Sequence, residues 1–279
     1  MNDAVSNFLP KTESLALRYG DDSIPAAGPW NDHLSVLLSH RSVRGYKSDP
    51  LPAGTLETLI AAAQSAATSS NLQTWSVIAV TDPEKKAKLA KLANNQKHIE
   101  QCPLFLCWLA DVSRNERLSQ QEDVTLETLP YFETFLVAAI DAALAAQNAT
   151  VAAESIGLSS VYIGAMRNYP TEAGEILGLP AGAVVAFGMC VGYAADNVVA
   201  EVKPRLPQDA ICYHNTYGNP NEQQLRSAYD AKMAAFSQKN EMSQDTWTKR
   251  VIGRMGKIPA MSGRDKLVSI LNGMGFPLK

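Results

Sequence analysis

The stretch FETFLVAAIDAALAAQNATVAA, residues 132–153, is apolar along most of its length. It nevertheless contains Glu133, Asp141, Gln147 and Asn148. A helix of roughly 25 residues here would be about 40 Å long. Because charged groups near the middle of a membrane span are costly, we expect no membrane span. Instead we predict a long helix that is buried in a core or between two subunits.

Shorter segments with strand and helix patterns lie on both sides of this stretch. Apolar runs bounded by turn residues predict strands at 75–82, 103–111, 158–164 and 183–193. Asp32, as N-cap, and the apolar positions that follow it predict a helix before His40. Periodic patterns predict further helices at 52–67, 83–93 and 170–177, and two or three between 222 and 275. Asp82 is expected to cap the helix at 83–93, Gly157 to end the long helix, and residues 112–123 to form a polar loop. This order indicates an α+β domain, and neither a Rossmann fingerprint nor a P-loop is present.

The composition is that of an ordinary soluble globular protein. Charged residues make up 19% and hydrophobic residues 46% of the 279 residues, with a formal net charge of −3. This balance gives no overall attraction to nucleic acid or to an anionic membrane, so any anion site must be a local cluster. The four cysteines have no metal-ligand spacing, and we expect reduced, mostly buried thiols, no metal site, no signal peptide and a cytoplasmic protein. Residues 1–30 are expected to form a polar arm, and residues 31–279 a single domain with a helical C-terminal section.

Four short motifs could bind a ligand, and each has a plain structural alternative. HRSVR at 40–44 could grip an anion or end a helix, and SSNLQTW at 69–75 could bind a polar ring or form a turn. The glycine of VYIGAMRN at 161–168 would let a ligand approach the backbone, although glycines commonly end strands. KPRLP at 203–207 projects two cations from a stiff loop, or forms surface salt bridges.

Taken together and in this order, these motifs and NQKH at 95–98 resemble the FMN-dependent nitroreductase superfamily. The similarity is greatest to its flavin reductase P and major oxygen-insensitive nitroreductase branch, and it covers about residues 33–250. The resemblance implies a mostly antiparallel central sheet flanked by helices, a long buried central helix, and an obligate homodimer with FMN at the subunit interface.

The resemblance also assigns cofactor-binding roles to individual positions. Those matched to the flavin phosphate, ribityl chain and N1/O2 edge are His40, Arg41, Ser42 and Arg44. Lys203 and Arg205 match a pair that completes the contacts with the phosphate and the ribityl chain. Those matched to a loop contributed by the neighbouring subunit are Thr68, Ser69, Ser70, Asn71 and Gln73. Gln96 matches a flavin-contacting glutamine, and the stretch beside the isoalloxazine ring comprises Tyr162, Ile163, Gly164 and Ala165. Lys47 lies outside the matched motif and is expected to be ordinary solvated surface.

The implied activity is ping-pong reduction of nitroaromatics, quinones or flavins with NAD(P)H as reductant. Because the flavin carries the hydride chemistry, no catalytic side chain is required, and none is predicted. The alternatives are a non-catalytic flavin-binding sensor or carrier and a related flavoenzyme, such as a dehalogenase or an enoate reductase. The physiological acceptor is not specified by these motifs.

One segment departs from the branch pattern. Where the branch often carries arginines for the 2′-phosphate of NADPH, residues 241–247 read EMSQDTW, and the first cations that follow are Lys249, Arg250 and Arg254. We therefore expect a weaker preference for NADPH than is typical of the branch.

Overall fold

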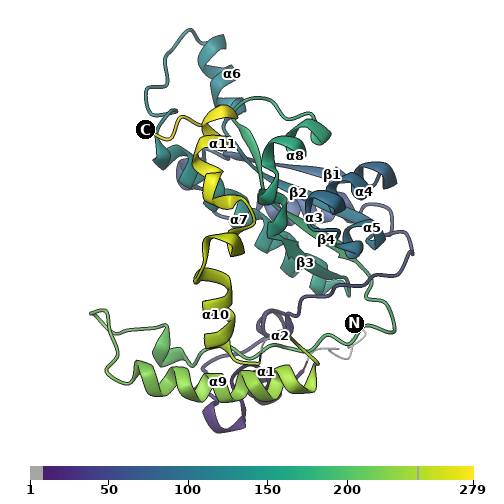
Figure 1. Cartoon of the computed structure of the whole chain (residues 1–279). Coiled ribbons are helices and arrows are strands. Elements are labelled where there is room, and N and C mark those ends of the chain that lie inside the picture. Colours follow the sequence, from purple (N-terminus) through teal and green to yellow (C-terminus); the bar gives the residue numbers. More distant parts are fainter. Residues whose placement is uncertain (1–8, 244) are drawn as a thin grey trace. The chain divides into compact units, whose positions relative to one another are not determined.

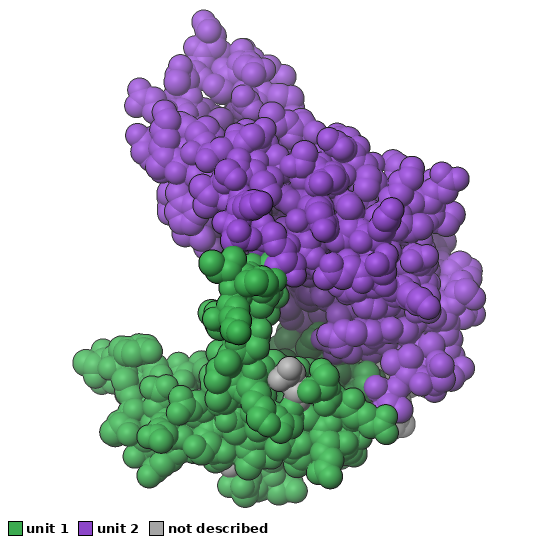
Figure 2. Space-filling view, viewed as in Figure 1, with its two compact units in different colours: residues 1–41, 200–261 green, residues 42–199, 262–279 purple. Residues whose placement is uncertain are grey.

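The computed structural model describes residues 9–243 and 245–279 of the chain (Figure 1). These residues fall into two compact units (Figure 2). Unit 1 comprises the described residues of 1–41 and 200–261, and unit 2 comprises residues 42–199 and 262–279. The amino-terminal segment therefore groups with the section that follows residue 200.

Unit 2 is built on a four-stranded antiparallel sheet in the order β1-β2-β4-β3. Its strands are β1 (Trp75–Val80), β2 (Leu104–Asp111), β3 (Ser159–Ile163) and β4 (Ala183–Gly192). Every residue of β2 is buried, which is why its sequence reads as a continuous apolar run. The α+β class, the antiparallel sheet and all four predicted strands are confirmed.

The helices of unit 2 are α3 (Thr55–Gln64), α4 (Pro83–Leu92), α5 (Lys97–Gln101), α6 (Ser113–Gln121), α7 (Phe132–Ser155), α8 (Pro170–Leu177) and α11 (Leu267–Gly273). Helix α7 is the predicted long helix, and it packs with α3 on one face of the sheet. Small side chains let the helix lie close to the strands; the fully buried ones facing Trp108 and Leu106 include Ala142, Ala145 and Ala149.

The opposite face of the sheet is covered by the short 3₁₀ helix η3 (Gly164–Asn168) and by α8. A Cβ on Gly188 of β4 would lie 2.3 Å from the ring of Phe105 and 3.3 Å from Met166 of η3. Glycine at position 188 therefore leaves room for the ring of Phe105, next to which Met166 of η3 packs.

Of the two predicted helix N-caps, one is confirmed and the other is wrong. Asp82 accepts a hydrogen bond from the Lys85 amide at 2.8 Å and caps α4, as predicted. The helix predicted before His40 is present as α2 (Asp32–Ser39), but its cap is Asn31, whose side chain accepts from the Leu34 amide at 3.1 Å. The expectation that Asp32 is the cap was therefore wrong by one residue.

The predicted loop at 112–123 was also wrong, because α6 occupies most of it. Its sequence, SRNERLSQQ, is polar on all sides, so it shows no apolar stripe. The capping group is Asp111, the last residue of β2, whose Oδ1 accepts from the amide and the hydroxyl of Ser113 at 3.0 and 2.6 Å. The start of α6 could not be recognised in the sequence, because the carboxylate that caps it belongs to Asp111 of the preceding strand.

Unit 1 contains α1 (Lys11–Tyr19), α2, α9 (Glu222–Lys239) and α10 (Trp247–Met255). Helices α9 and α10, together with α11 of unit 2, confirm the predicted carboxy-terminal helices. Nine residues of the expected polar arm form α1, and residues 1–8 lie outside the described part of the chain. Lys232 of α9 donates to the Tyr19 carbonyl at 2.7 Å and pairs with Asp22 at 2.8 Å, which fixes the end of α1 against α9. The remaining short 3₁₀ turns are η1 (Asp21–Ser23), η2 (Ser69–Asn71), η4 (Gln208–Ala210), η5 (Ile258–Met261) and η6 (Arg264–Lys266).

Candidate functional site

The last three residues of the HRSVR motif belong to unit 2, where Ser42 forms a β-bridge with Ser160 of β3 at the edge of the sheet. Val43 is 1% exposed and its amide donates to the Ser160 carbonyl at 3.1 Å. Since neighbouring side chains of an extended segment point to opposite sides, Ser42 and Arg44 point outward and are exposed. Arg44 makes no hydrogen bond or ion pair with any other described residue, and its guanidinium keeps its donors available.

The two predicted cationic segments of unit 1 have ordered backbones and accessible side chains. Arg41 and Arg205 are exposed, and their guanidinium groups make only long contacts to nearby carbonyls, at 3.3 Å to Ser39 and 3.3 Å to Lys203. The Tyr229 hydroxyl of α9 donates to the Pro204 carbonyl at 3.0 Å and steadies this loop. Both arginines retain most of their five donors for a ligand.

A buried arginine from α1 joins these two segments. Arg18 is 7% exposed, and it donates to the His40 carbonyl at 3.0 Å and to the Lys203 carbonyl at 2.8 Å. Arg18 was not predicted from the sequence, because an arginine in a polar segment is usually solvent-exposed. Its partners are backbone carbonyls, which no sequence pattern identifies.

The stretch from β3 into η3 lies within unit 2, next to the loop that carries Gln96. The Asn168 side chain is 5% exposed, donates to Asn94 Oδ1 at 3.4 Å and accepts from Arg264 Nε at 2.9 Å. These bonds tie the end of η3 to the loop before α5, so Gln96 and the Ile163–Gly164–Ala165 stretch belong to one structural neighbourhood.

Tyr162 is oriented into the core rather than away from it. Its hydroxyl lies 3.0 Å from the Thr150 hydroxyl of α7, and its ring is 5.2 Å from the Phe187 ring. Burial raises the pKa of Tyr162 to about 12, with the Thr150 contact opposing the rise. The backbone of Tyr162 therefore remains the part that a ligand could contact, and its predicted cofactor role stays a prediction.

His98 of the NQKH motif lies beside Arg44. Its pKa is lowered, first by burial and then by the Arg44 guanidinium, which favours a neutral imidazole. The ring is 9% exposed, and its Nε2 is buried with no hydrogen-bond partner among the described residues. A buried unpartnered nitrogen is unusual in a packed structure and is consistent with a group that a ligand would complete.

The loop at 68–73 is strained and exposed. Ser70, Asn71 and Gln73 have φ values of 49°, 56° and 50°, in the left-handed region that non-glycine residues seldom adopt. Such strain persists only where the surrounding structure imposes it, and it concentrates at binding sites. Residues 69–73 are all exposed, so their polar side chains are presented to solvent.

Asp141 of α7 imposes this conformation. Its side chain is 1% exposed; Oδ1 accepts from the Ser69 amide at 3.1 Å and Oδ2 from the Thr74 hydroxyl at 3.3 Å. Arg114 of α6 adds a bond from Nη1 to the Gln73 carbonyl at 3.0 Å. The sequence analysis used Asp141 only as an argument against a membrane span. A carboxylate inside an apolar helix also indicates a buried side chain that is hydrogen-bonded to a neighbouring segment.

We expect Asp141→Ala to destabilise the protein by about 2–4 kcal/mol, because the Ser69 amide and the Thr74 hydroxyl would lose their buried acceptor. Asp141→Asn keeps an acceptor for Ser69 and should cost about 1 kcal/mol. Glu133→Ala, an exposed change on the same helix, is the control. Urea unfolding monitored by circular dichroism measures all three; an Asp141→Ala midpoint equal to that of the control would contradict the anchoring role.

The structure brings only some of the predicted residues together within one chain. Ser42 lies at the end of the sheet where β2 begins at Leu104, whereas Thr74 follows the 68–73 loop at the end where β2 approaches Ala110. Six strand residues at about 3.4 Å each separate these ends by about 20 Å. The 68–73 loop is therefore far from the Ser42 and Arg44 side chains of the same chain.

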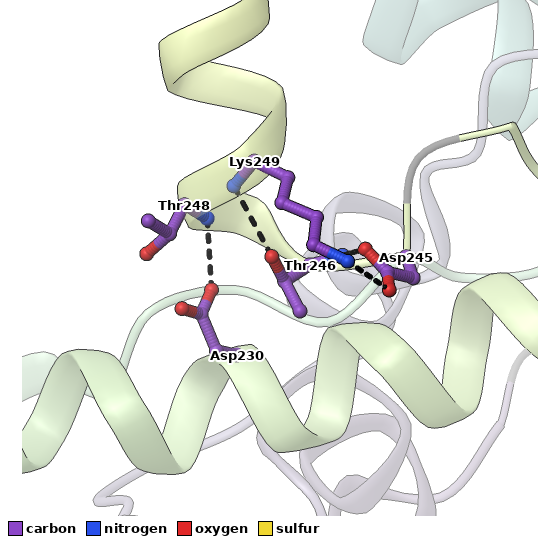
Figure 3. Close-up of polar contacts among 5 residues, drawn as sticks. All are labelled: Asp230, Asp245, Thr246, Thr248 and Lys249. Atoms are coloured by element: carbon purple, nitrogen blue, oxygen red, sulfur yellow. Dashed lines mark hydrogen bonds and ion pairs between the residues drawn. The ribbon is translucent and has the colours of Figure 1, made fainter.

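The segment that departs from the branch pattern has its cations engaged (Figure 3). Thr246 caps α10 by accepting from the Lys249 amide at 3.1 Å, and Lys249 Nζ pairs with Asp245 at 2.6 Å. Asp230 of α9 accepts from the Thr248 amide at 2.8 Å. Arg254 donates to the Ala260 carbonyl. Lys249 and Arg254 thus have partners within the chain.

A cavity of about 600 Å³ lies within unit 1 beside this segment. Its walls carry Arg205 and the aromatic rings of Tyr19, Tyr229 and Trp247. Aromatic faces and one cation are a combination that accepts flat heteroaromatic groups with an attached phosphate.

Within unit 1, the exposed guanidinium of Arg205 and the aromatic walls of the cavity are groups suited to a phosphorylated heteroaromatic ligand, as is the exposed guanidinium of Arg44 within unit 2. The sequence model described as "Nitroreductase family" matches residues 37–193, and that described as "Nitroreductase family, C-terminal domain" matches residues 203–279. The chain belongs to the nitroreductase family.

Individual relatives agree with this assignment. The chain is 37% identical over 235 residues to "FMN reductase (NADPH)" of Bacillus subtilis, covering 82% of this chain and 93% of the relative. It is 36% identical to "NADPH-flavin oxidoreductase" of Vibrio harveyi, over 88% of this chain and 98% of the relative. The structure of a nitroreductase from Bacillus subtilis superposes with a TM-score of 0.82 at 35% identity, over 88% of this chain and all of that one.

The residues present fit an FMN. Arg44 has unused donors for the phosphate, the buried Nε2 of His98 lacks a partner, and the strained 68–73 loop presents amide and hydroxyl groups suited to the edge of a flavin ring. Among the described residues, no cluster of histidine, cysteine or acidic side chains could hold a metal ion. Cys102, Cys107 and Cys190 are free and buried, as expected, whereas Cys212 is free and exposed.

Proposed function

We propose that the protein is an FMN-dependent oxidoreductase that uses NAD(P)H for the two-electron reduction of nitroaromatics, quinones or flavins. The observation that carries this proposal is the exposed Arg44 without a partner in the described structure, set within a chain of the nitroreductase family. A guanidinium held outward at a sheet edge is suited to bidentate contact with a phosphate.

The residues proposed to hold the cofactor are those predicted from the sequence. The residues proposed to bind the phosphate, ribityl chain and N1/O2 edge are His40, Arg41, Ser42 and Arg44. Lys203 and Arg205 would complete the contacts with the phosphate and the ribityl chain. Gln96 and the backbone of residues 162–165 would line the ring. When bound, FMN supplies the hydride chemistry; the chain orients the ring, donates hydrogen bonds to it and leaves one face accessible. A cation held near the N1/O2 edge favours negative charge there.

We propose that a homodimer completes the site. Helix α7 exposes a four-residue-spaced stripe of Phe132, Leu136, Ile140 and Leu144, which are 51%, 40%, 49% and 43% exposed. An apolar stripe on a helix whose other face packs in the core is typical of an interface. The separation of about 20 Å along β2 between the 68–73 loop and Ser42 supports a second copy as the occupant, because a partner's loop can supply what the chain's own loop does not reach.

By length and composition alone, α7 is also apolar enough to cross a membrane. Its buried Asp141, hydrogen-bonded to Ser69 and Thr74, supports the core and interface role instead. We accordingly propose a cytoplasmic protein with small-molecule electron acceptors.

An anaerobic titration tests this function. Reconstituted with FMN, the protein is expected to show flavin absorbance that bleaches on addition of NADH or NADPH and returns on addition of a nitroaromatic or a quinone. A protein that takes up no FMN would overturn the assignment. Flavin absorbance that neither nucleotide bleaches would indicate the sensor or carrier alternative.

The same preparation tests nucleotide preference. Because Lys249 and Arg254 are engaged within the chain, we expect the ratio of kcat/KM for NADPH to that for NADH to stay below about 100, which is roughly 2.7 kcal/mol of discrimination. Steady-state rates with both nucleotides measure this ratio, and Asp245→Asn, which releases Lys249, should raise it. A wild-type ratio well above 100 would contradict the expectation.

A further inference from the structure

Arg18 lies in α1, in a part of the chain that precedes the family match beginning at residue 37. The Bacillus subtilis nitroreductase structure is matched over its whole length while covering 88% of this chain. Helix α1 therefore lies outside the part of the chain that the family model matches.

The Arg18 guanidinium donates to backbone carbonyls of two separate segments. Nη2 donates to the Leu38 carbonyl at 2.6 Å and the His40 carbonyl at 3.0 Å, and Nη1 donates to the Lys203 carbonyl at 2.8 Å. In return, the Arg18 carbonyl accepts from the Arg205 amide at 3.0 Å. Arg18 thus contacts the backbone of both cationic segments that are proposed to bind the phosphate, residues 40–41 and 203–205. These two segments together are called the phosphate grip.

The chemistry of this contact favours arginine over any other residue. The guanidinium stays charged at every accessible pH and holds its donors in a rigid plane, so it can satisfy carbonyls that converge from two segments. Hydrogen bonds from a charged donor are stronger than those from a neutral one. A buried charge bonded in this way also penalises conformations in which either segment moves away.

We propose that Arg18 is a positioning residue that preorganises the His40–Arg41 and Lys203–Arg205 segments for the phosphate of the flavin. The proposal rests on the proposed function for the identity of the ligand. Fixing the carbonyls of His40 and Lys203 restricts the backbone from which Arg41 and Arg205 project, so less ordering remains to be done when the anion binds.

The test compares Arg18→Gln and Arg18→Lys with Arg226→Gln, an exposed arginine of α9 in the same unit. Dissociation constants for FMN and for riboflavin, which lacks the phosphate, are measured by flavin fluorescence on flavin-depleted full-length protein. We expect Arg18→Gln to weaken FMN binding about 10-fold or more while changing riboflavin binding less than about 2-fold. Arg18→Lys should fall between wild type and Arg18→Gln, and Arg226→Gln should match wild type.

A second readout needs no flavin. The Arg205–Leu206 bond is a trypsin site within the 203–207 loop, which Arg18 contacts. Its cleavage rate in flavin-depleted protein should rise severalfold in Arg18→Gln but not in Arg226→Gln.

Equal loss of FMN and riboflavin affinity would mean a merely structural role and overturn the proposal. So would unchanged FMN affinity with an unchanged cleavage rate. Wild-type protein that binds neither flavin would instead refute the proposed function, while the cleavage rates would still report whether Arg18 holds the loop. If Arg18→Gln does not fold, the comparison rests on Arg18→Lys.

Discussion

The double substitution Arg41→Ala/Arg44→Ala is expected to weaken FMN binding by about 100-fold or more, so that the purified protein is nearly colourless. Both side chains are exposed and keep most of their donors unused by the described chain. Each hydrogen bond to a charged group contributes about 1.5–3 kcal/mol, and solvent exposure favours the lower end of that range. Two such losses therefore amount to about 3 kcal/mol, or roughly 150-fold.

Lys47→Ala is the matched control for this substitution. Lys47 lies in the same segment, but it pairs with Asp196 at 2.6 Å, and Asp196 is highly exposed. We expect its removal to change FMN affinity less than about 2-fold, since exposed ion pairs contribute little and its charge is not directed to the ligand. Fluorescence titration of flavin-depleted proteins measures both variants. Equal effects of Lys47→Ala and the double substitution would show that only overall charge matters.

The strands and the long helix could be predicted because their signals are local. The apolar runs at β1, β2 and β4 have strand length, and the 24 residues of α7 have no breaker among them. Helix α6 could not be predicted by the same reasoning, because its residues are polar on every side and its cap, Asp111, sits in the preceding strand. Helix α1 is short and lies between Pro10 and Gly20, so its flanking breakers obscured it.

The side chains proposed to touch the ligand were accessible from sequence motifs, whereas the residues that hold them in place were not. Arg18 donates to the backbone carbonyls of Leu38, His40 and Lys203, and carbonyls are present at every position of a chain. The left-handed backbone at Ser70 and Gln73 is likewise absent from the pattern, since serine and glutamine do not favour it. Asp141 is the exception: a carboxylate within an apolar helix must be bonded if it is buried, so its presence alone indicated a buried polar partner.

Mixed dimers give the sharpest expected result for the shared site. The grip variant is Arg41→Ala/Arg44→Ala and the loop variant is Asn71→Ala/Gln73→Ala, each expected to bind FMN poorly as a homodimer. If the 68–73 loop of one subunit completes the site of the other, a heterodimer of the two variants has one intact site and one doubly defective site. It should then bind about one FMN per dimer.

The two variants would be co-expressed with different affinity tags, and the heterodimer isolated by two successive purifications. Absorbance at a free FMN concentration between the wild-type and variant dissociation constants gives the stoichiometry. If each site instead lay within one chain, both sites of the heterodimer would carry a defect and FMN would stay near the homodimer levels. We expect one FMN per heterodimer, because the 68–73 loop and Ser42 of the same chain are separated by about 20 Å along β2. Restoration would therefore establish both the dimer and the exchange of loops between subunits, whereas the colourless heterodimer would refute the shared site.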